Sequence, residues 1–362
     1  MKFRRAEPQV NATETVRLDG LTIIRFLAAL WVFVFHFDLR ISLPAPTPLA
    51  RIISNGALAM PVFFMLSGLV LGLRYQYSYT SFGAFFRARV ARIYPAYFLG
   101  LIACLPWLFF SHQGDLATLL FLLPVDILLL QAWYPNLWHY WHHTGTWSIS
   151  VEFFLYASFP LFLGLAKLTT RNLKLVGLAC ALFAGSFVPS LGLPTSRPLP
   201  VPVFYALPIF SLPAFVIGIT LAELHRRGAR GSVWAVLGLP VFLGIWGHLN
   251  TRYAQFNAIT LPLIAGSLLY FARLAGGNGF EQMSIYRALV YLGEISYAIF
   301  VFQIPLLLAL EQLLPHLPAL HWSATFFSLL VVNMAVAAIS HHWLEPAGSA
   351  LVKRWWRLPA AR

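Results

Sequence analysis

Long apolar stretches with few charged residues dominate this chain and limit what it can fold into. Several run for about 18 residues or more, the length that an α-helix needs to cross roughly 30 Å of hydrocarbon. Of the 362 residues, 59% are hydrophobic and only 10% are charged, whereas a soluble domain carries about 25% charged residues. We therefore predict an all-α fold, a polytopic bundle of transmembrane helices.

Ten segments are predicted to cross the membrane. They are residues 21–39, 57–74, 94–111, 147–166, 175–190, 202–224, 232–248, 257–273, 288–310 and 322–344. A further apolar segment, 116–133, has Pro124 and Asp126 near its middle, and a charge at the bilayer centre costs about 2.5–3.5 kcal/mol on insertion scales. This segment either crosses the membrane as an eleventh span, or does not cross it and is re-entrant or lies against the outer face.

The distribution of lysine and arginine decides between these two topologies. With ten spans, 20 of these residues face the side of the N-terminus and 4 face the other side. If segment 116–133 crosses, the counts become 10 and 14. Because cytoplasmic loops carry the excess of positive charge, we predict ten spans with both termini in the cytoplasm. The net charge of +13 then reflects topology, and no nucleic-acid-binding motif accompanies it.

The predicted organisation is one membrane domain, residues 18–350, between two cytoplasmic tails. The N-terminal tail is residues 1–17, and the C-terminal tail, residues 351–362, is basic. The first apolar run is long, so we expect a retained span and not a cleaved signal peptide. Cys104 and Cys180 fall inside apolar segments, which argues against a disulfide framework and against a zinc site.

The first span, "RFLAALWVFVFHF", contains Arg25 and His36. With the N-terminus inside, Arg25 lies about one turn into the helix and can extend its charge to the cytoplasmic interface. His36 is eleven residues further on, about 16 Å along the axis at 1.5 Å per residue. It is either a neutral histidine that bonds neighbouring helices or a base or nucleophile in a polar cavity.

A cluster of arginines occupies "FFRARVARIYPAY", residues 85–97, just before the third predicted span. Arg89 and Arg92 share one face at a spacing of i, i+3 if the stretch is helical. Topology anchoring needs only their charge. A pair of guanidinium groups on one face is also a suitable clamp for phosphate, and the spacing alone does not separate the two interpretations.

The segment "TWSISVEFFLYASFPL", residues 146–161, places Glu152 about five residues into a span that runs inward. A carboxylate at such a depth indicates a functional site, although an ion pair or a polar network between helices are structural alternatives. Upstream, His139, His142 and His143 lie among aromatic residues. We interpret them as an interfacial aromatic belt, because no carboxylate or cysteine spacing supports a metal site.

Two further glutamates lie near the cytoplasmic ends of the last two spans. Glu294 belongs to "LGEISYAIFVFQIPL" and Glu345 to "HHWLEPAGSALVKRWWR". Either carboxylate can pair with a basic residue at that end of the bundle, including Arg25.

Several short motifs together resemble the bacterial membrane acyltransferase 3 family, which O-acylates surface and secreted glycans. In chain order they are "GLTIIRFLAAL", "FH" (35–36), "FFMLSG" (63–68), "RVARIYPAY" (89–97), "WSISVEFFLY" (147–156), "LGEISY" (292–297) and "EPAG" (345–348). The resemblance covers roughly residues 18–350. Two positions depart from the family pattern: Gln303 stands where a histidine often follows the Ser-Tyr pair, and Glu345 precedes Pro346 without a spacer.

The resemblance implies a ten-span enzyme of the bacterial inner (plasma) membrane. Its donor is implied to be cytoplasmic acyl-CoA, usually acetyl-CoA, and its acceptor a hydroxyl of an exported polysaccharide or a lipid-linked glycan. No metal is implied. Arg25, Arg89 and Arg92 are expected to hold the anionic end of the donor. His36 is expected to act as a general base or a transient acyl carrier, with Glu152 orienting or stabilising the imidazole.

The motif residues Trp147, Ser148, Tyr156 and Glu345 are expected to support this site. A proton-coupled transporter or flippase of envelope precursors is the alternative function, since arginine, histidine and glutamate in spans also mark such carriers. Paired broken helices in corresponding halves, which transporters often have, are not evident in the sequence. A scaffold of envelope assembly, a third interpretation, does not require His36.

Overall fold

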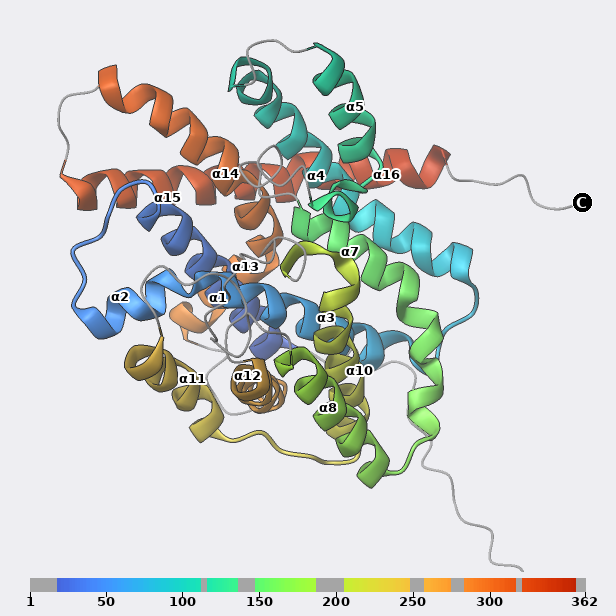
Figure 1. Cartoon of the computed structure of the whole chain (residues 1–362). Coiled ribbons are helices and arrows are strands. Elements are labelled where there is room, and N and C mark those ends of the chain that lie inside the picture. The colour runs from blue at the N-terminus through green and yellow to red at the C-terminus, as the bar shows by residue number, and fades with distance from the viewer. Residues whose placement is uncertain are drawn as a thin grey trace, which may run out of the picture.

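The structure, a computed structural model, describes residues 18–111, 116–135, 147–186, 205–247, 257–274, 283–316 and 321–355. Within these ranges the chain forms helices and no β-strand. In this described part, seven helical stretches are long and apolar enough to cross a membrane, and three shorter apolar helices accompany them. The predicted all-α, polytopic membrane bundle is thus confirmed (Figure 1).

Each of the ten predicted spans contains a helix. These helices are α1 (Asp19–Asp38), α3 (Ala59–Tyr75), α4 (Phe82–Ser111), α7 (Trp147–Ser158), α8 (Thr170–Gly185), α10 (Leu212–Arg226), α11 (Val233–Trp246), α12 (Asn257–Phe271), α14 (Ser296–Leu313) and α15 (Trp322–Ile339). The shorter helices are α2 (Thr47–Ser54), α5 (Leu116–Ile127), α13 (Ser284–Glu294) and α16 (Glu345–Trp355). The 3₁₀ segment η4 (Phe159–Lys167) extends α7, and the π-helix η9 (Ser340–Leu344) joins α15 to α16.

Two helices extend beyond the spans that hydropathy predicts. Helix α4 begins at Phe82, twelve residues before the predicted start, so Arg89 and Arg92 lie within the helix and not in a loop before it. Its 30 residues make it about 45 Å long. After α15, the chain stays helical through η9 to Trp355, past the predicted span end at 344. An apolar window misses these polar turns, although the backbone continues its hydrogen bonding through them.

The segment 116–133 does not form a full span. Helix α5 has 12 residues and is therefore about 18 Å long, too short for roughly 30 Å of hydrocarbon. The chain then turns at Leu129, whose φ is +56°. Ser150 of α7 donates a hydrogen bond to the Leu129 carbonyl at 2.6 Å, and Tyr97 of α4 donates to the Asp126 carbonyl at 2.5 Å. These bonds hold the turn against α4 and α7.

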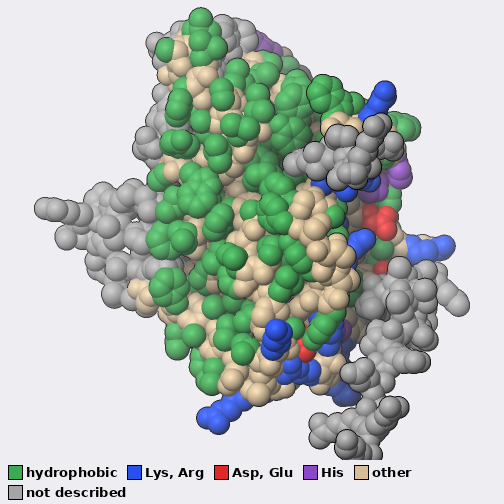
Figure 2. Space-filling model, turned by 90° about the vertical axis from the view of Figure 1, so that its right-hand side faces the viewer, with side chains coloured by type: hydrophobic (Ala, Val, Ile, Leu, Met, Phe, Trp, Pro, Cys, Tyr) green, Lys and Arg blue, Asp and Glu red, His purple; other side chains and the backbone are tan. Residues whose placement is uncertain are grey.

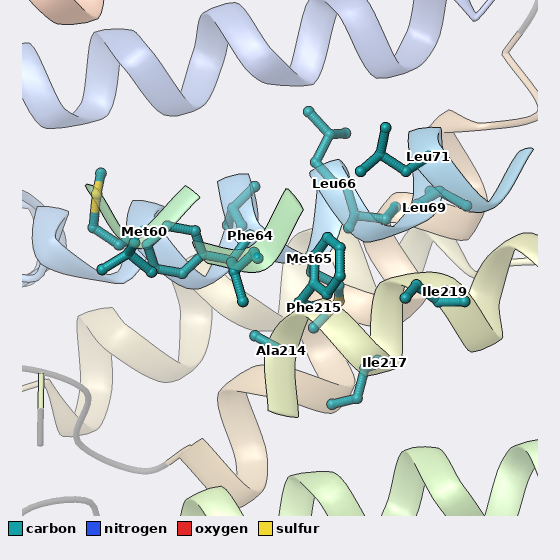
Figure 3. Packing of buried hydrophobic residues seen from close by; sticks show 14 of the residues in the cluster. Met60, Phe64, Met65, Leu66, Leu69, Leu71, Ala214, Phe215, Ile217 and Ile219 are labelled. Atoms are coloured by element: carbon teal, nitrogen blue, oxygen red, sulfur yellow. The ribbon is translucent and has the colours of Figure 1, made fainter. Parts of the chain in front are cut away.

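Helices α3 and α10 form the centre of the bundle, and most of each is enclosed by other helices. Gly68 faces the Phe215 carbonyl, and Gly218 faces the Met65 carbonyl, at positions where a Cβ atom overlaps the opposite oxygen. Small residues permit such close backbone contact between membrane helices. Figure 3 shows Phe64, Met65 and Phe215 packed between the two helices.

Arginine side chains form hydrogen bonds and a salt bridge at one end of the α3–α10 pair. Arg226 Nη2 donates to the carbonyls of Gly72 at 2.9 Å and Leu73 at 2.5 Å, which satisfies acceptors in the last turn of α3. Arg227 Nε lies 2.9 Å from Glu223 Oε1 in a salt bridge. We call this end, formed by Arg226, Arg227 and the last turn of α3, the basic end. In Figure 2, hydrophobic side chains cover most of the visible face, and lysine and arginine side chains gather in its lower and right-hand parts.

The contact between α3 and α10 predicts that position 68 tolerates no side chain. Gly68→Val should lower the stability of the folded protein by about 1–3 kcal/mol or more, because a backbone carbonyl must move to make room. Thermal unfolding of the detergent-solubilised protein measures this. Gly83→Ala is the matched control, since a Cβ atom at Gly83 meets nothing within 4 Å. Equal melting temperatures for both variants would contradict this account of the bundle centre.

Candidate active site

A pocket opens among helices α1, α3, α4, α7 and α14. The polar side chains that line it are Arg25, Ser67, Arg89, Arg92, Ser148, Glu152, Tyr156, Ser296 and Tyr297. Its other lining residues are apolar, among them Met60, Phe63 and Phe300. Three separate helices, α1, α4 and α7, thus bring together three arginines and one carboxylate that were each selected from the sequence.

Arg89 is the most enclosed of the three arginines, with 7% of its surface exposed. Its Nη2 donates to the hydroxyl of Tyr75 at 2.9 Å. The guanidinium carbon lies 5.2 Å from the centre of the Tyr75 ring and 6.0 Å from that of Tyr156, within the range of cation–π attraction. Its Nε is buried and has no hydrogen-bond acceptor among the described residues, so it retains donor capacity.

Arg25 and Arg92 reach the same pocket from α1 and α4. Arg25 is close enough to Glu152 and Glu294 to be attracted by their charges, and it is repelled by Arg92. Glu294 therefore lies within electrostatic range of Arg25, and an ion pair between Arg25 and either Glu294 or Glu345 stays a prediction. Glu152 is the one carboxylate among the described lining residues, so the three arginines give the pocket a net charge of +2. A site of this composition favours an anionic ligand.

Glu152 is held from two sides. Ser67 of α3 donates a hydrogen bond to Glu152 Oε1 at 2.9 Å, and Tyr156, one turn along α7, donates to the same oxygen. The contact from Tyr156 follows from the helical spacing of i, i+4. The carboxylate is therefore fixed in position at the wall of the pocket, and Oε2 accepts no hydrogen bond within the part of the chain that the structure describes.

The pocket is elongated along α3. Met60 and Leu71 both line it, and eleven residues of helix separate them, or about 16 Å. Leu71 lies near the basic end, whereas Met60 lies at the other end of α3. The pocket therefore extends from near the arginines into the apolar interior and is bounded there by aromatic side chains, with the rings of Phe63 and Phe300 5.6 Å apart.

His36 is not one of the residues that line this pocket. Eleven helical residues rotate it by about 20° from Arg25, so both lie on the same face of α1. Gly56 packs against the Phe35 side chain and the Trp31 carbonyl, which places the start of α3 level with this part of α1. His36 therefore lies beyond the Met60 end of the pocket by about one helical turn.

The remaining predicted residues take different places. Ser148 and Tyr156 line the pocket. Trp147 is buried at the start of α7 with its ring 4.6 Å from that of Tyr205, outside the pocket lining. Glu345 accepts a hydrogen bond from Ser340 at 3.3 Å and lies close enough to Arg92 to interact with its charge. The two hydrogen bonds of Glu152 come from Ser67 and Tyr156, so its action on His36 stays a prediction.

The histidines of the aromatic segment, His139, His142 and His143, lie outside the described residues. Among the residues that are described, no group of three or more histidine, cysteine, aspartate or glutamate side chains is placed to hold a metal ion.

Three residues of the site were not selected from the sequence. Ser67 bonds Glu152, Tyr75 bonds Arg89, and Tyr297 of α14 donates to the Ile93 carbonyl at 2.7 Å while lining the pocket. Ser67 and Tyr297 lie within the "FFMLSG" and "LGEISY" motifs, so the motifs indicated them. No comparable signal marked Tyr75, because a tyrosine at the end of an apolar helix is ordinary in membrane proteins.

These features describe a helical membrane protein with a cationic pocket that is lined by several of its apolar helices. Comparison with known proteins agrees: residues 18–342 match the acyltransferase domain family, acyltransferase 3, and the chain belongs to that family. A relative, the acyltransferase MdmB of Streptomyces mycarofaciens, is 30% identical over 302 residues, which cover 79% of this chain and 78% of the relative. No solved structure matches the chain.

The position of Glu152 predicts different effects for two substitutions. Glu152→Leu should destabilise the protein by about 1–3 kcal/mol, because it leaves two hydroxyl donors without an acceptor and three arginines without a counter-charge. Glu152→Gln keeps an acceptor oxygen and should cost less than about 1 kcal/mol. Thermal unfolding of both variants provides the measurement. The account fails if the leucine variant is as stable as the wild type.

Proposed function

We propose that this protein transfers an acyl group, acetyl in the first instance, from acyl-CoA to a hydroxyl group of a glycan. The acceptor is an exported polysaccharide or a lipid-linked sugar. The enzyme resides in the bacterial inner membrane with both termini in the cytoplasm, so that the basic end and its pocket face the cytoplasmic supply of acyl-CoA. Membership of the acyltransferase family supports the reaction class.

The observation that carries this proposal is the pocket with three arginines and one carboxylate. The nucleotide end of CoA bears several phosphate charges, and guanidinium groups bind phosphate through paired hydrogen bonds. Arg89 is oriented by Tyr75 and retains a free Nε donor. Arg92 is exposed and can meet a phosphate that enters from the cytoplasmic side.

The shape of the pocket suits the rest of the donor. Its length along α3 is about 16 Å, and its walls beyond the arginines are mostly apolar. A thin, mostly uncharged arm that ends in a thioester can extend there, whereas the phosphates stay at the arginines. The thioester then approaches the level of His36 in the outer half of the bundle.

The chemistry requires a base at that level. The acceptor hydroxyl oxygen attacks the thioester carbonyl carbon, and His36 takes the hydroxyl proton. The C–S bond then breaks, and His36 returns the proton to the thiolate, so the products are an ester and free CoA. Histidine suits this task because its unperturbed pKa lies near neutral pH. The Glu152 carboxylate offsets one of the three arginine charges in the donor pocket.

The donor clamp predicts a loss of affinity when two arginines are removed. Arg89→Ala with Arg92→Ala should weaken acetyl-CoA binding by about 100-fold or more, since each charge-assisted hydrogen bond contributes about 1.5–3 kcal/mol. Equilibrium binding to the purified protein in lipid nanodiscs gives the affinity. Lysines at both positions should restore it only in part, because lysine lacks the planar fork.

The matched control is Arg171→Ala with Arg230→Ala, which removes two exposed arginines outside the pocket. This variant should bind acetyl-CoA as the wild type does. If the Arg89/Arg92 variant also binds normally, these arginines serve topology alone and the donor site lies elsewhere.

The proposed base predicts that His36→Gln inserts normally and binds acetyl-CoA but transfers the acyl group about 100-fold more slowly or worse. Glutamine keeps a hydrogen-bonding group of similar size and cannot take the proton. Mass spectrometry of surface glycans compares cells with the wild-type gene, the variant and no gene. Wild-type acylation in the His36→Gln cells would assign His36 a structural role, and identical glycans with and without the gene would overturn the proposed function.

A further inference from the structure

Gln303 of α14 is wholly buried, with 0% of its surface exposed. Its Nε2 donates to the Phe300 carbonyl at 3.0 Å. Its Oε1 is also buried and has no hydrogen-bond donor among the described residues. The opposite orientation of the amide would set Oε1 against the Phe300 oxygen, two acceptors together, so the hydrogen bond fixes which atom is left over. A buried acceptor without a donor costs about 1–3 kcal/mol.

The register of α14 against α1 gives the level of the Gln303 Oε1 atom along the helix axis. Helix α1 and the α13–α14 pair touch at two points: Gly293 packs against the Thr22 carbonyl, and Arg40 Nε lies 2.9 Å from Glu311 Oε1. The residue numbers differ by 271 in both pairs, so the helices run parallel without slipping. Residue 303 is therefore level with residue 32 of α1, one turn or about 6 Å short of His36.

The pocket lies on the other side of Gln303. By the same register, Arg25 is level with Ser296, and both line the pocket. Phe300, one turn further along α14, also lines it and pairs with Phe63 at the apolar end. Along the axis the order is Arg25, Phe300, Gln303 and His36. Gln303 is not among the residues that line the pocket, but its level along the axis falls between the Phe300 end of the pocket and the proposed base.

We propose that Gln303 Oε1 accepts a hydrogen bond from the amide N–H of the acyl-CoA arm that lies nearest the sulfur. This inference rests on the proposed function. In that arm two methylene groups separate the amide nitrogen from the sulfur, a span of about 4 Å when extended. With the thioester carbon at His36, the amide falls about one helical turn behind it, at the level of Gln303. Gln303 is therefore a positioning residue that sets how far the thioester advances.

The donor amide also supplies the N–H donor that the buried Gln303 Oε1 lacks within the described residues. The neighbouring side chains Ile299, Ile304 and Leu307 are apolar and buried, and none has a proton to donate. A ligand N–H that enters the interior needs an acceptor for the same reason. The hydrogen bond between Gln303 Oε1 and the donor N–H therefore offsets the desolvation cost of both groups. It favours the binding of acyl donors that carry an amide at this place over donors that lack one.

The test compares two donors: acetyl-CoA and its analogue in which oxygen replaces the N–H nearest the sulfur. Both keep the phosphates that the arginines bind. The full-length protein in nanodiscs should bind acetyl-CoA about 3- to 10-fold more tightly than the analogue, the size expected for one net hydrogen bond. Gln303→Met, which keeps the volume and removes the acceptor, should bind the two donors equally. Gln303→Asn is a second variant, for use if the methionine variant does not fold. It withdraws the side-chain amide by about 1.5 Å and should also bind the two donors equally.

Asn333 of α15 provides the matched control. It is also wholly buried, donates from Nδ2 to the Ile299 carbonyl at 3.2 Å, and leaves Oδ1 without a donor among the described residues, but α15 contributes nothing to the pocket lining. Asn333→Leu should keep the wild-type preference for acetyl-CoA. A preference that survives in Gln303→Met, or that the wild type lacks, overturns the inference alone. If the wild type binds neither donor, the proposed function falls with it.

Discussion

Three guanidinium groups enter an apolar helix bundle around one carboxylate, and the other features of the site follow from that arrangement. Charged groups in a membrane interior are costly unless they are paired or face a polar cavity. Arg25, Arg89 and Arg92 meet this condition through a shared pocket, the Glu152 carboxylate and the tyrosines that contact Arg89. The lining itself keeps a net charge of +2, with Glu294 and Glu345 within electrostatic range of Arg25 and Arg92, and this excess of positive charge favours an anionic ligand.

Close helix contacts keep these groups in register. Gly68 and Gly218 allow α3 and α10 to touch through their backbones, and Ser67, adjacent to Gly68, bonds Glu152. At the other side of the pocket, contacts at both ends hold α1 parallel to α14. The same packing that stabilises the bundle therefore fixes the axial spacing between the arginines, Gln303 and His36. The acyl transfer that we propose depends on that spacing.

The all-helical membrane bundle, the short segment at 116–133 and the convergence of Arg25, Arg89, Arg92 and Glu152 could be predicted from the sequence, whereas seven helices in the described residues, and not ten, are long and apolar enough to cross a membrane. Hydropathy and charge bias report directly on which segments enter the bilayer, and buried charges are rare enough to indicate a site. The starting point of α4 could not be predicted this way, because its first turns are polar and hydropathy does not register them.

Contacts between segments that are distant in the chain could not be predicted from the sequence either. Tyr75 beside Arg89 and the buried oxygen of Gln303 depend on how helices pack, and a helical pattern shows only which residues share a face. The sequence placed His36 on the same helix as Arg25, but its position beyond the pocket became evident only from the packing of Gly56 against α1.

The central claim is that an acyl-CoA arm runs from the arginines along α3 toward His36. Photocrosslinking tests it most directly, with a CoA thioester whose short acyl group carries a diazirine and with the full-length protein in nanodiscs. The account predicts labelled peptides from α1, α3 and α14 near Met60, Phe63 and Phe300, and loss of the label when acetyl-CoA competes. Label confined to α8, α11 or α12, or label that acetyl-CoA does not displace, would contradict it.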